Sequence, residues 1–370
     1  MSPITIEPGL RRGKIVAPPS KSHEHRLLIA DFLSGNLKRL SSCEDDADDI
    51  LATKRCLRAL AQETSSPLLD CGESGSSRRF LSPVAAALGK RPIFEMAGRL
   101  AERPQVDWEE LKAGKFVLDG SVSSQFVTGL LFALPILNGD SSIRFSSPLQ
   151  SRGYVEMTTR VLSQFGIVIH DSCDGYDIPG NQRYKANGGI QVEGDWSGAA
   201  FWFVMNFLGG EVEVSGLDEM SAQPDRAVLP ILKEMEKIRG GGKIEIDVSS
   251  CPDLFPTLSV AAGSMKGESV FVGTKRLRLK ESDRCEAMAN VLRNFGVECT
   301  QGEDTFVVHG SSGVFNGCEI CTHGDHRIAM ASAIGAVRAK ASVTIDNADC
   351  AAKSYPTFFK EFFNLERIKL

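Results

Sequence analysis

Six apolar, small-residue segments recur along the chain, and each follows a short stretch rich in Ser, Gly or Asp. The polar stretches begin near residues 19, 72, 120, 194, 251 and 324. An apolar run of helical length predicts a buried helix, and Ser, Asp or Gly directly before it is typical of a helix N-cap. Five of the six runs end at a glycine, and the sixth ends less clearly near Lys340. This self-similarity predicts six related structural units.

Amphipathic segments with a more polar face lie between the apolar runs. The segments predicted to form amphipathic helices are 48–60, 103–111, 154–165, 224–236, 281–295 and 353–363. Short β-like pieces, such as 212–214 and 343–345, flank them. Each unit is therefore expected to contain a buried helix, an amphipathic helix and several short strands. Three units per domain would give two similar domains joined by a cleft.

Composition and charge narrow the class of protein. The 370 residues are 42% hydrophobic and 24% charged, which is ordinary for a globular chain of two or three domains and excludes a disordered protein, a coiled coil and a collagen-like fibre. The formal net charge is −5, whereas general nucleic-acid binders are usually basic, so no nucleic-acid partner is expected. A local basic site for a small anion remains open.

The location of the protein is predicted from what the sequence lacks. The first residues contain no apolar core of a secretory signal, and the longest apolar stretch, 126–137, falls short of the ~20 residues that a membrane helix needs. Ten cysteines are ordinary usage for this length. A reduced, cytoplasmic protein without a membrane partner is expected.

A zinc site is the alternative interpretation of one cysteine-containing segment. Cys318 and Cys321 are followed by His323 and His326, which superficially resembles a set of zinc ligands. The spacing does not match common structural zinc sites, and the segment alternates like a strand that leads into a helix. The strand-to-helix interpretation is preferred, and no metal is expected.

The polar helix starts also suggest chemistry. Helix N-termini carry about half a positive charge and bind anions readily. Capping alone explains any single start. Several starts that also carry Lys, Arg and Ser would form an anion site if they converged on one cleft.

A collinear set of short motifs runs through the six units. They are PSKSHEHR at 19–26, CGESGSSRRF at 71–80, ERP at 102–104, LDGSVSSQF at 118–126, SRGY at 151–154, EGDWS at 193–197, CPD at 251–253, LKESDR at 279–284, GDHRIAM at 324–330 and AKSYP at 352–356. In this order they resemble the 5-enolpyruvylshikimate-3-phosphate (EPSP) synthase family of enolpyruvyl transferases. The resemblance extends from about residue 13 to about residue 363. Single triplets within it are unspecific, whereas the ordered set is very specific.

The resemblance implies a reaction and a fold. The family transfers the enolpyruvyl (1-carboxyvinyl) group of phosphoenolpyruvate to the 5-hydroxyl of shikimate 3-phosphate and releases phosphate, in chorismate and aromatic amino-acid biosynthesis, without a metal or organic cofactor. Its α/β fold has two similar domains, each of three repeated βαβαββ-type units in an inverse α/β barrel-like arrangement, with the substrate cleft between them. The expected domains are 1–14 plus 194–370 and 15–193, with crossovers near 12–20 and 190–196. A monomer is expected.

The substrates explain which residue types the site requires. Each substrate carries a phosphate of about −1.5 to −2 charge and a carboxylate, so several fixed cations are needed, and Arg suits planar anions best. The resemblance assigns shikimate 3-phosphate to Lys21, Ser22, Arg26, Ser123, Ser124, Gln125, Ser151, Asp253 and Lys280. It assigns phosphoenolpyruvate to Lys21, Gly75, Arg103, Gln125, Arg284, Arg327 and Lys353. Gly75 has no Cβ and would let a helix start approach the ligand closely.

The resemblance also implies the residues that transfer protons. Asp253 would accept the proton of the 5-hydroxyl, and Glu281 and Lys21 would exchange protons with C3 of the enol, in a division that the sequence leaves open. The alternative for Asp253 is a helix N-cap after Pro252, and both interpretations can hold together. The alternative for Glu281 is an ion pair with Lys280 or Arg284.

Several neighbouring residues have open interpretations. Glu73 replaces the Asn of many family members and is expected to turn toward Arg78 or Arg79. Arg79 itself could be structural, and Tyr154 could pack on the substrate ring or fill a helix start. Phe80 borders the expected site, and Arg276 replaces an Asn that some members use to hold substrate. Asp325 is expected to orient His326 or Arg327 without contacting ligand.

Two other functions compete with this one. The related transferase that acts on a UDP-sugar shares the fold, but its reactive cysteine loop has no counterpart in this sequence. A catalytically silent anion-binding protein would need no base, whereas this chain carries Asp253, Glu281 and Lys353 together.

Overall fold

The chain divides into two compact units. The computed structural model describes residues 2–108, 110–311 and 313–368. Unit 1 comprises Met1–Ser20 and Glu193–Leu370, and unit 2 comprises Lys21–Val192. Unit 2 is therefore inserted into the sequence of unit 1.

The chain crosses between the two units twice. The two crossing segments lie side by side where they leave unit 1. Pro19 and Gly194 form an isolated antiparallel bridge. The backbone N–H of Ser20 donates to the carbonyl of Glu193 at 2.8 Å. This bridge fixes the segment that leads directly into Lys21.

Unit 2 contains five helices among its described residues, and three of them are the predicted buried ones. The buried helices are α1 (Lys21–Leu33), α3 (Gly75–Ala87) and α4 (Ser124–Ala133), and the amphipathic helices are α2 (Asp48–Leu60) and α5 (Arg152–Gln164). The strands are β3 (Leu68–Asp70), β4 (Ile93–Glu95), β5 (Lys115–Asp119), β6 (Ser141–Ser147), β7 (His170–Ser172) and β8 (Gly175–Ile178). Strands β3 and β4 pair in parallel, and the other four form a sheet in the order β5-β6-β8-β7.

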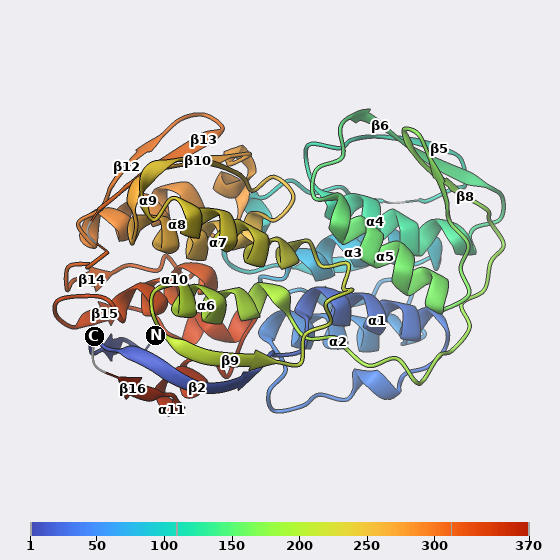
Figure 1. Cartoon of the computed structure of the whole chain (residues 1–370). Helices are drawn as coiled ribbons and strands as arrows, with labels where there is room; N and C mark the ends of the chain where they lie inside the picture. Colours follow the sequence, from blue (N-terminus) through green and yellow to red (C-terminus); the bar gives the residue numbers. More distant parts are fainter. Residues whose placement is uncertain (1, 109, 312, 369–370) are drawn as a thin grey trace. The chain divides into compact units, whose positions relative to one another are not determined.

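Unit 1 contains the other three buried helices. They are α6 (Trp196–Phe207), α8 (Phe255–Gly263) and α10 (His326–Ala336), and the amphipathic helices are α7 (Val228–Lys237), α9 (Arg284–Asn294) and α11 (Phe358–Asn364). The strands are β1 (Ile4–Ile6), β2 (Leu10–Val16), β9 (Glu211–Ser215), β10 (Gly240–Asp247), β11 (Lys266–Val272), β12 (Glu298–Gln301), β13 (Thr305–Gly310), β14 (Glu319–Ile320), β15 (Val343–Ile345) and β16 (Glu366–Ile368). They form sheets in the orders β1-β15-β14, β16-β2-β9 and β10-β11-β13-β12, so both ends of the chain enter this unit's sheets (Figure 1).

The two four-stranded sheets have the same topology. In unit 2, β5 pairs in parallel with β6, which pairs antiparallel with β8, and β7 pairs antiparallel with β8. In unit 1, β10, β11, β13 and β12 repeat this pattern. Each sheet combines with two helices in the chain order βαβαββ. This confirms the α/β fold class and shows the βαβαββ pattern in two of the six predicted units, and none of the sheets in the described residues closes into a barrel.

One predicted amphipathic helix is absent from the described residues, and a second is shorter than predicted. Segment 103–111 has no helix in its described residues; a 3₁₀ helix, η2 (Gly98–Glu102), precedes it, and Glu109 lies outside the described residues. Pro104 forces Arg103 into an extended conformation, with φ −80° and ψ 152°. In segment 353–363, Pro356 separates the 3₁₀ helix η7 (Asp349–Lys353) from α11. The other 3₁₀ helices are η1 (Lys38–Leu40), η3 (Leu134–Ile136), η4 (Pro224–Ala227), η5 (Pro252–Leu254) and η6 (Lys275–Leu279).

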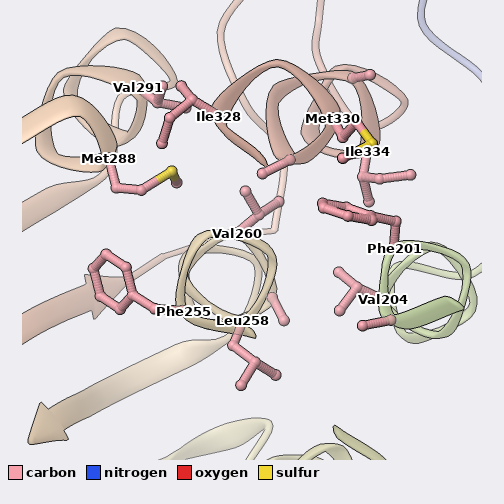
Figure 2. Packing of buried hydrophobic residues seen from close by; sticks show 14 of the residues in the cluster. Phe201, Val204, Phe255, Leu258, Val260, Met288, Val291, Ile328, Met330 and Ile334 are labelled. Atoms are coloured by element: carbon pink, nitrogen blue, oxygen red, sulfur yellow. The ribbon is translucent and has the colours of Figure 1, made fainter. Parts of the chain in front are cut away.

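Each unit has its own hydrophobic core. In unit 1 the core lies where α6, α8, α9 and α10 pack together, and Figure 2 shows side chains from these helices pointing toward one another around α8. The labelled core residues are Phe201, Val204, Phe255, Leu258, Val260, Met288, Val291, Ile328, Met330 and Ile334. This packing fixes the starts of α8, α9 and α10 relative to one another. No helix in the described part of the chain has the length and apolar character needed to cross a membrane.

Leu258 provides a test of this core. The Leu258→Ala substitution should lower the free energy of unfolding by about 2–5 kcal/mol, because it removes fully buried methyl groups and leaves a cavity in the core beside α8. Leu229 on α7 is 43% exposed, so Leu229→Ala should change stability by less than about 0.5 kcal/mol. Denaturant titration of both variants measures the difference. Equal losses would contradict the described packing.

Candidate functional site

The starts of three helices in unit 1 bring together most of the site residues predicted in this half. Asp253 lies in η5, directly before α8, and Arg284 is the first residue of α9. Arg327 is the second residue of α10. Side chains cap two of these helices, because Asp283 accepts the N–H of Glu286 in α9 and Asp325 accepts the N–H of Arg327 in α10.

Arg284 is the centre of this cluster. Its side chain is 1% exposed and contacts three carboxylates. Nη1 donates to Oδ1 of Asp253 at 2.6 Å, Nη2 donates to Oε2 of Glu281 at 2.9 Å, and Nε donates to Oδ2 of Asp325 at 2.9 Å. Burial by itself would lower the pKa of Arg284, but Asp325, Glu281 and Asp253 raise it above its ordinary value. Arg284 is therefore a permanent buried cation.

Asp253 joins Arg284 to two further cations. Its Oδ2 accepts from Nη2 of Arg327 at 2.9 Å, and its Oδ1 lies 3.8 Å from Nζ of Lys280. Burial by itself favours the neutral acid, but Arg327, Lys280 and Arg284 together hold the pKa of Asp253 well below its ordinary value. The N-cap position of α8 is Leu254, which makes no side-chain capping bond. The described contacts of the Asp253 side chain are thus ion pairs, and the expected ion pair of Glu281 with Arg284 is present.

Lys280 has an unusual environment for a lysine. Burial lowers its pKa from 10.5 to about 8, although the attraction of Asp253 opposes this shift. The positive charges of Arg284 and Arg276 add to the decrease. Lys280 therefore loses its charge in a pH range in which ordinary lysines remain protonated.

Lys353 is the remaining phosphoenolpyruvate residue predicted in unit 1. It ends η7 and is buried. Two residues farther along, the Tyr355 hydroxyl contacts Nε1 of Trp202 at 3.2 Å and donates to Glu361 at 2.5 Å. These buried contacts anchor the chain next to Lys353.

The predicted residues of unit 2 include a second buried cation, Arg26. Its Nε donates to Oγ1 of Thr158 at 2.8 Å, and its Nη atoms donate to the carbonyls of Ser22 and Tyr154 at 2.5 and 2.7 Å. The guanidinium lies 5.3 Å from the centre of the Phe80 ring. Among the described residues, these hydrogen-bond partners are all neutral, and burial lowers the pKa of Arg26 to about 10. Arg26 is suited to bind an added anion.

Lys21 also begins a helix. It is the first residue of α1, and its Nζ donates to Oδ2 of Asp49 on α2 at 2.8 Å. Asp49 is itself buried. This contact holds Lys21 at the helix start, beside the predicted substrate residue Ser22.

Gly75 begins α3 at a point where two guanidinium groups approach the backbone. A Cβ at position 75 would lie 2.9 Å from Nη1 of Arg79 and 3.3 Å from Nη1 of Arg103. Arg79 donates to Oε1 of Gln125 at 2.6 Å, and Nε2 of Gln125 donates to Oγ of Ser76 at 3.0 Å. Arg79 thus contacts Gln125, and Arg79 and Arg103 both lie beside Gly75.

The remaining predicted serines lie at helix starts in unit 2. Ser123 caps α4 by accepting the N–H of Gln125 at 3.2 Å, and Ser124 is the first residue of that helix. Ser151 precedes α5 with a left-handed backbone, φ 55° and ψ 40°, and is buried. These serines therefore lie at the starts of helices, as the sequence predicted.

The structure specifies the contacts of several residues whose interpretation was open. The Glu73 carboxylate lies against Gly98, whose backbone has φ +55°, and Arg78 pairs with Asp107. Phe80 is buried in the core of unit 2 and packs against Phe132. Glu73 thus lies against Gly98, and the expectation that it turns toward Arg78 or Arg79 stays a prediction.

Three residues that hold the site were not predicted in their roles. Asp49 holds Lys21, Thr158 holds Arg26, and Asp325 contacts Arg284 rather than only its neighbours in sequence. Asp49 and Thr158 are buried polar residues on amphipathic helices. A polar residue at a core position of such a helix is the sequence signal that could have identified both.

The cysteine-containing segment is a short strand that leads into a helix. Within residues 2–108, 110–311 and 313–368, no group of three or more His, Cys, Asp or Glu side chains is placed to hold a metal ion. Cys318 and Cys321 flank β14, and His326 begins α10. The preferred strand-to-helix interpretation is confirmed.

Known proteins resemble this chain over nearly its whole length. The sequence model of the family described as EPSP synthase (3-phosphoshikimate 1-carboxyvinyltransferase) matches residues 37–362. The 3-phosphoshikimate 1-carboxyvinyltransferase of Clostridium kluyveri is 36% identical over 421 aligned positions, which cover 99% of this chain and 97% of the relative. That of Clostridium acetobutylicum is 37% identical, with 99% and 97% covered. Because these alignments are longer than 370 residues, the relatives contain segments that this chain lacks.

Solved structures show the same fold. An EPSP synthase from Acinetobacter baumannii superposes with a TM-score of 0.74 at 24% identity, covering 98% of this chain and 97% of that one. The enolpyruvyl transferase NikO from Streptomyces tendae has a TM-score of 0.70 at 12% identity, covering 99% and 98%. With the family match and the sequence relatives, these findings show that the chain belongs to the EPSP synthase family.

Proposed function

We propose that this chain transfers the enolpyruvyl group of phosphoenolpyruvate to the 5-hydroxyl of shikimate 3-phosphate and releases phosphate. The observation that carries the proposal is the cluster in which Asp253 is shared by Arg284, Arg327 and Lys280. Such a cluster contains both the cations that bind phosphate and carboxylate groups and a carboxylate that can accept a proton. Membership of the EPSP synthase family supports the same reaction.

Arg26 supports an anionic first substrate. Because its described hydrogen-bond partners are neutral, its charge is available to an added phosphate. We assign Arg26, together with Lys21, Ser22 and the serines at the starts of α4 and α5, to shikimate 3-phosphate. Arg26 is held rigidly by three hydrogen bonds, so little ordering of the side chain is needed when the ligand binds.

Arg284 and Arg327 are assigned to phosphoenolpyruvate, with Lys353, Arg103 and Lys21. In the free protein, the Asp253 carboxylate accepts hydrogen bonds from both arginines, at 2.6 Å from Arg284 and 2.9 Å from Arg327. The phosphate and carboxylate of phosphoenolpyruvate compete for the same donors. Binding therefore weakens the hold of the arginines on Asp253 and raises its pKa toward the range in which it can accept a proton.

Asp253, released by this exchange, moves the proton in the addition step, and Glu281 or Lys21 moves the proton at C3. The 5-hydroxyl oxygen forms a bond to C2 of phosphoenolpyruvate while its proton passes to Asp253. C3 gains a proton from Glu281 or Lys21, which gives a tetrahedral intermediate. The same group then takes a proton back from C3, which restores the double bond as the C2–O bond to phosphate breaks. The cations that hold the phosphate stabilise the charge of this leaving group.

Release of inorganic phosphate tests the proposed function. The purified protein should release phosphate only when shikimate 3-phosphate and phosphoenolpyruvate are both present, with one enolpyruvyl product formed for each phosphate. A UDP-sugar as the only acceptor should give no release. Release with the UDP-sugar alone would favour the related transferase, and no release with any acceptor would favour a silent anion-binding protein.

The Asp253→Asn variant tests the proposed base. The substitution keeps the shape of the side chain but removes its ability to accept a proton, so turnover should fall by ~10²-fold or more. The KM for shikimate 3-phosphate should change much less. Asp171→Asn, at an exposed position of β7, is the matched control and should retain full turnover. Near-normal turnover of Asp253→Asn would remove Asp253 from the mechanism.

The pH dependence of the reaction tests Lys280. Its pKa is about 8, so its positive charge is present below this pH and is lost as the pH rises through it. The kcat/KM for shikimate 3-phosphate should therefore decrease above about pH 8. An arginine stays charged throughout this range, so Lys280→Arg should shift the decrease to higher pH. A decrease that stays near pH 8 in the variant would assign it to another group.

A further inference from the structure

Three carboxylates contact Arg284, and they differ in their exposure. The side chains of Asp253 and Glu281 are 23% and 15% exposed, whereas that of Asp325 is 0% exposed. A substrate anion can replace a carboxylate that water reaches, but it cannot replace one that is fully enclosed by protein. Asp325 is thus the carboxylate that remains on Arg284 when the substrate anion competes with Asp253.

The surroundings of Asp325 require a carboxylate at this position. Oδ2 accepts from Nε of Arg284 at 2.9 Å and from Oγ of Ser282 at 3.0 Å. Oδ1 accepts from the backbone N–H of Arg327 at 3.0 Å, and Nη2 of Arg284 lies 3.5 Å from it. Both oxygens therefore face donors. An asparagine would have to turn its NH₂ group toward donors in either orientation, so it cannot satisfy all of these contacts.

The same residue fixes both predicted phosphoenolpyruvate arginines. It binds the side chain of Arg284 directly and holds the backbone of Arg327 at the start of α10. Arg284 and Arg327 are otherwise joined through Asp253, which is the group that must be released during the reaction. Without Asp325, the release of Asp253 would leave Glu281 as the described carboxylate on the Arg284 guanidinium and would leave the backbone N–H of Arg327 without its cap.

We propose that Asp325 is a positioning residue for phosphoenolpyruvate: it keeps Arg284 and Arg327 in place while the substrate anion replaces Asp253. Asp325 itself contacts no substrate. The inference rests on the proposed function and adds a division of roles among the three carboxylates. Asp253 exchanges with the substrate, whereas Asp325 stays bound to Arg284.

The test compares the KM values of the two substrates in two variants. Asp325→Asn should raise the KM for phosphoenolpyruvate by about 10- to 100-fold, as expected for the loss of buried hydrogen bonds to a charged group, and should raise that for shikimate 3-phosphate by less than about 3-fold. Thr158→Val removes the buried acceptor of Arg26 and is the matched variant in unit 2. It should show the opposite selectivity, with a rise of about 10-fold for shikimate 3-phosphate.

A purely structural role for Asp325 would give a different result. Loss of the α10 cap alone would reduce the fraction of active protein, which lowers kcat and leaves both KM values unchanged. That outcome, or an equal rise of both KM values, would overturn the inference.

A second variant covers the case in which Asp325→Asn does not fold. Ser282→Ala removes one donor to Asp325 and leaves its charge and the α10 cap intact. It should raise the KM for phosphoenolpyruvate selectively by about 2- to 5-fold, and an unchanged value would overturn the inference. Wild-type turnover is measured first. An inactive wild type contradicts the proposed function. An active wild type, with variants whose KM for phosphoenolpyruvate does not rise more than that for shikimate 3-phosphate, contradicts only the role of Asp325.

Discussion

A guanidinium as deeply buried as that of Arg284 is stable only where carboxylates and hydrogen bonds replace the water that it has lost. Three carboxylates do so here, and they come from three separate segments before or at the starts of α8, α9 and α10. The core that packs these helices together therefore also fixes the charge cluster. Because the charges balance one another, the cluster is stable in the free protein, and a substrate anion can enter it by exchange with a carboxylate.

The repeated architecture explains why helix starts supply so many of the site residues. Each repeat places a buried helix after a short polar segment, so its capping residues and first-turn side chains lie at the end of a rigid element. In unit 2 the same arrangement presents Lys21, Gly75 and Ser124 as the first residues of their helices. Arg284 in unit 1 and Lys21 in unit 2 are both paired with carboxylates, whereas Arg26 in unit 2 is held by hydroxyl and carbonyl groups. The buried cations of the site thus have different electrostatic environments.

The sequence predicted the buried helices because apolar runs and caps are local signals, whereas the βαβαββ pattern was implied by the resemblance to the EPSP synthase family. The failure at 103–111 has a local cause too, since Pro104 stops the helix that the amphipathic pattern favours. Contacts between side chains far apart in the chain were harder to predict. The motifs named Arg284 and Arg327, but Arg284 and Asp325 lie 41 positions apart, and no local signal marks their contact. Thr158 illustrates the same limit, because it lies 132 residues from Arg26.

The central claim is that substrate anions replace Asp253 on the two arginines. A crystal structure of the protein with shikimate 3-phosphate and an unreactive anionic mimic of phosphoenolpyruvate tests it most directly. The account predicts that Arg284 and Arg327 donate to the mimic, that Asp253 moves out of hydrogen-bond distance of at least one of them, and that the Asp325 contact to Nε of Arg284 is unchanged. A bound mimic that contacts neither arginine, with Asp253 still paired to both, would contradict it.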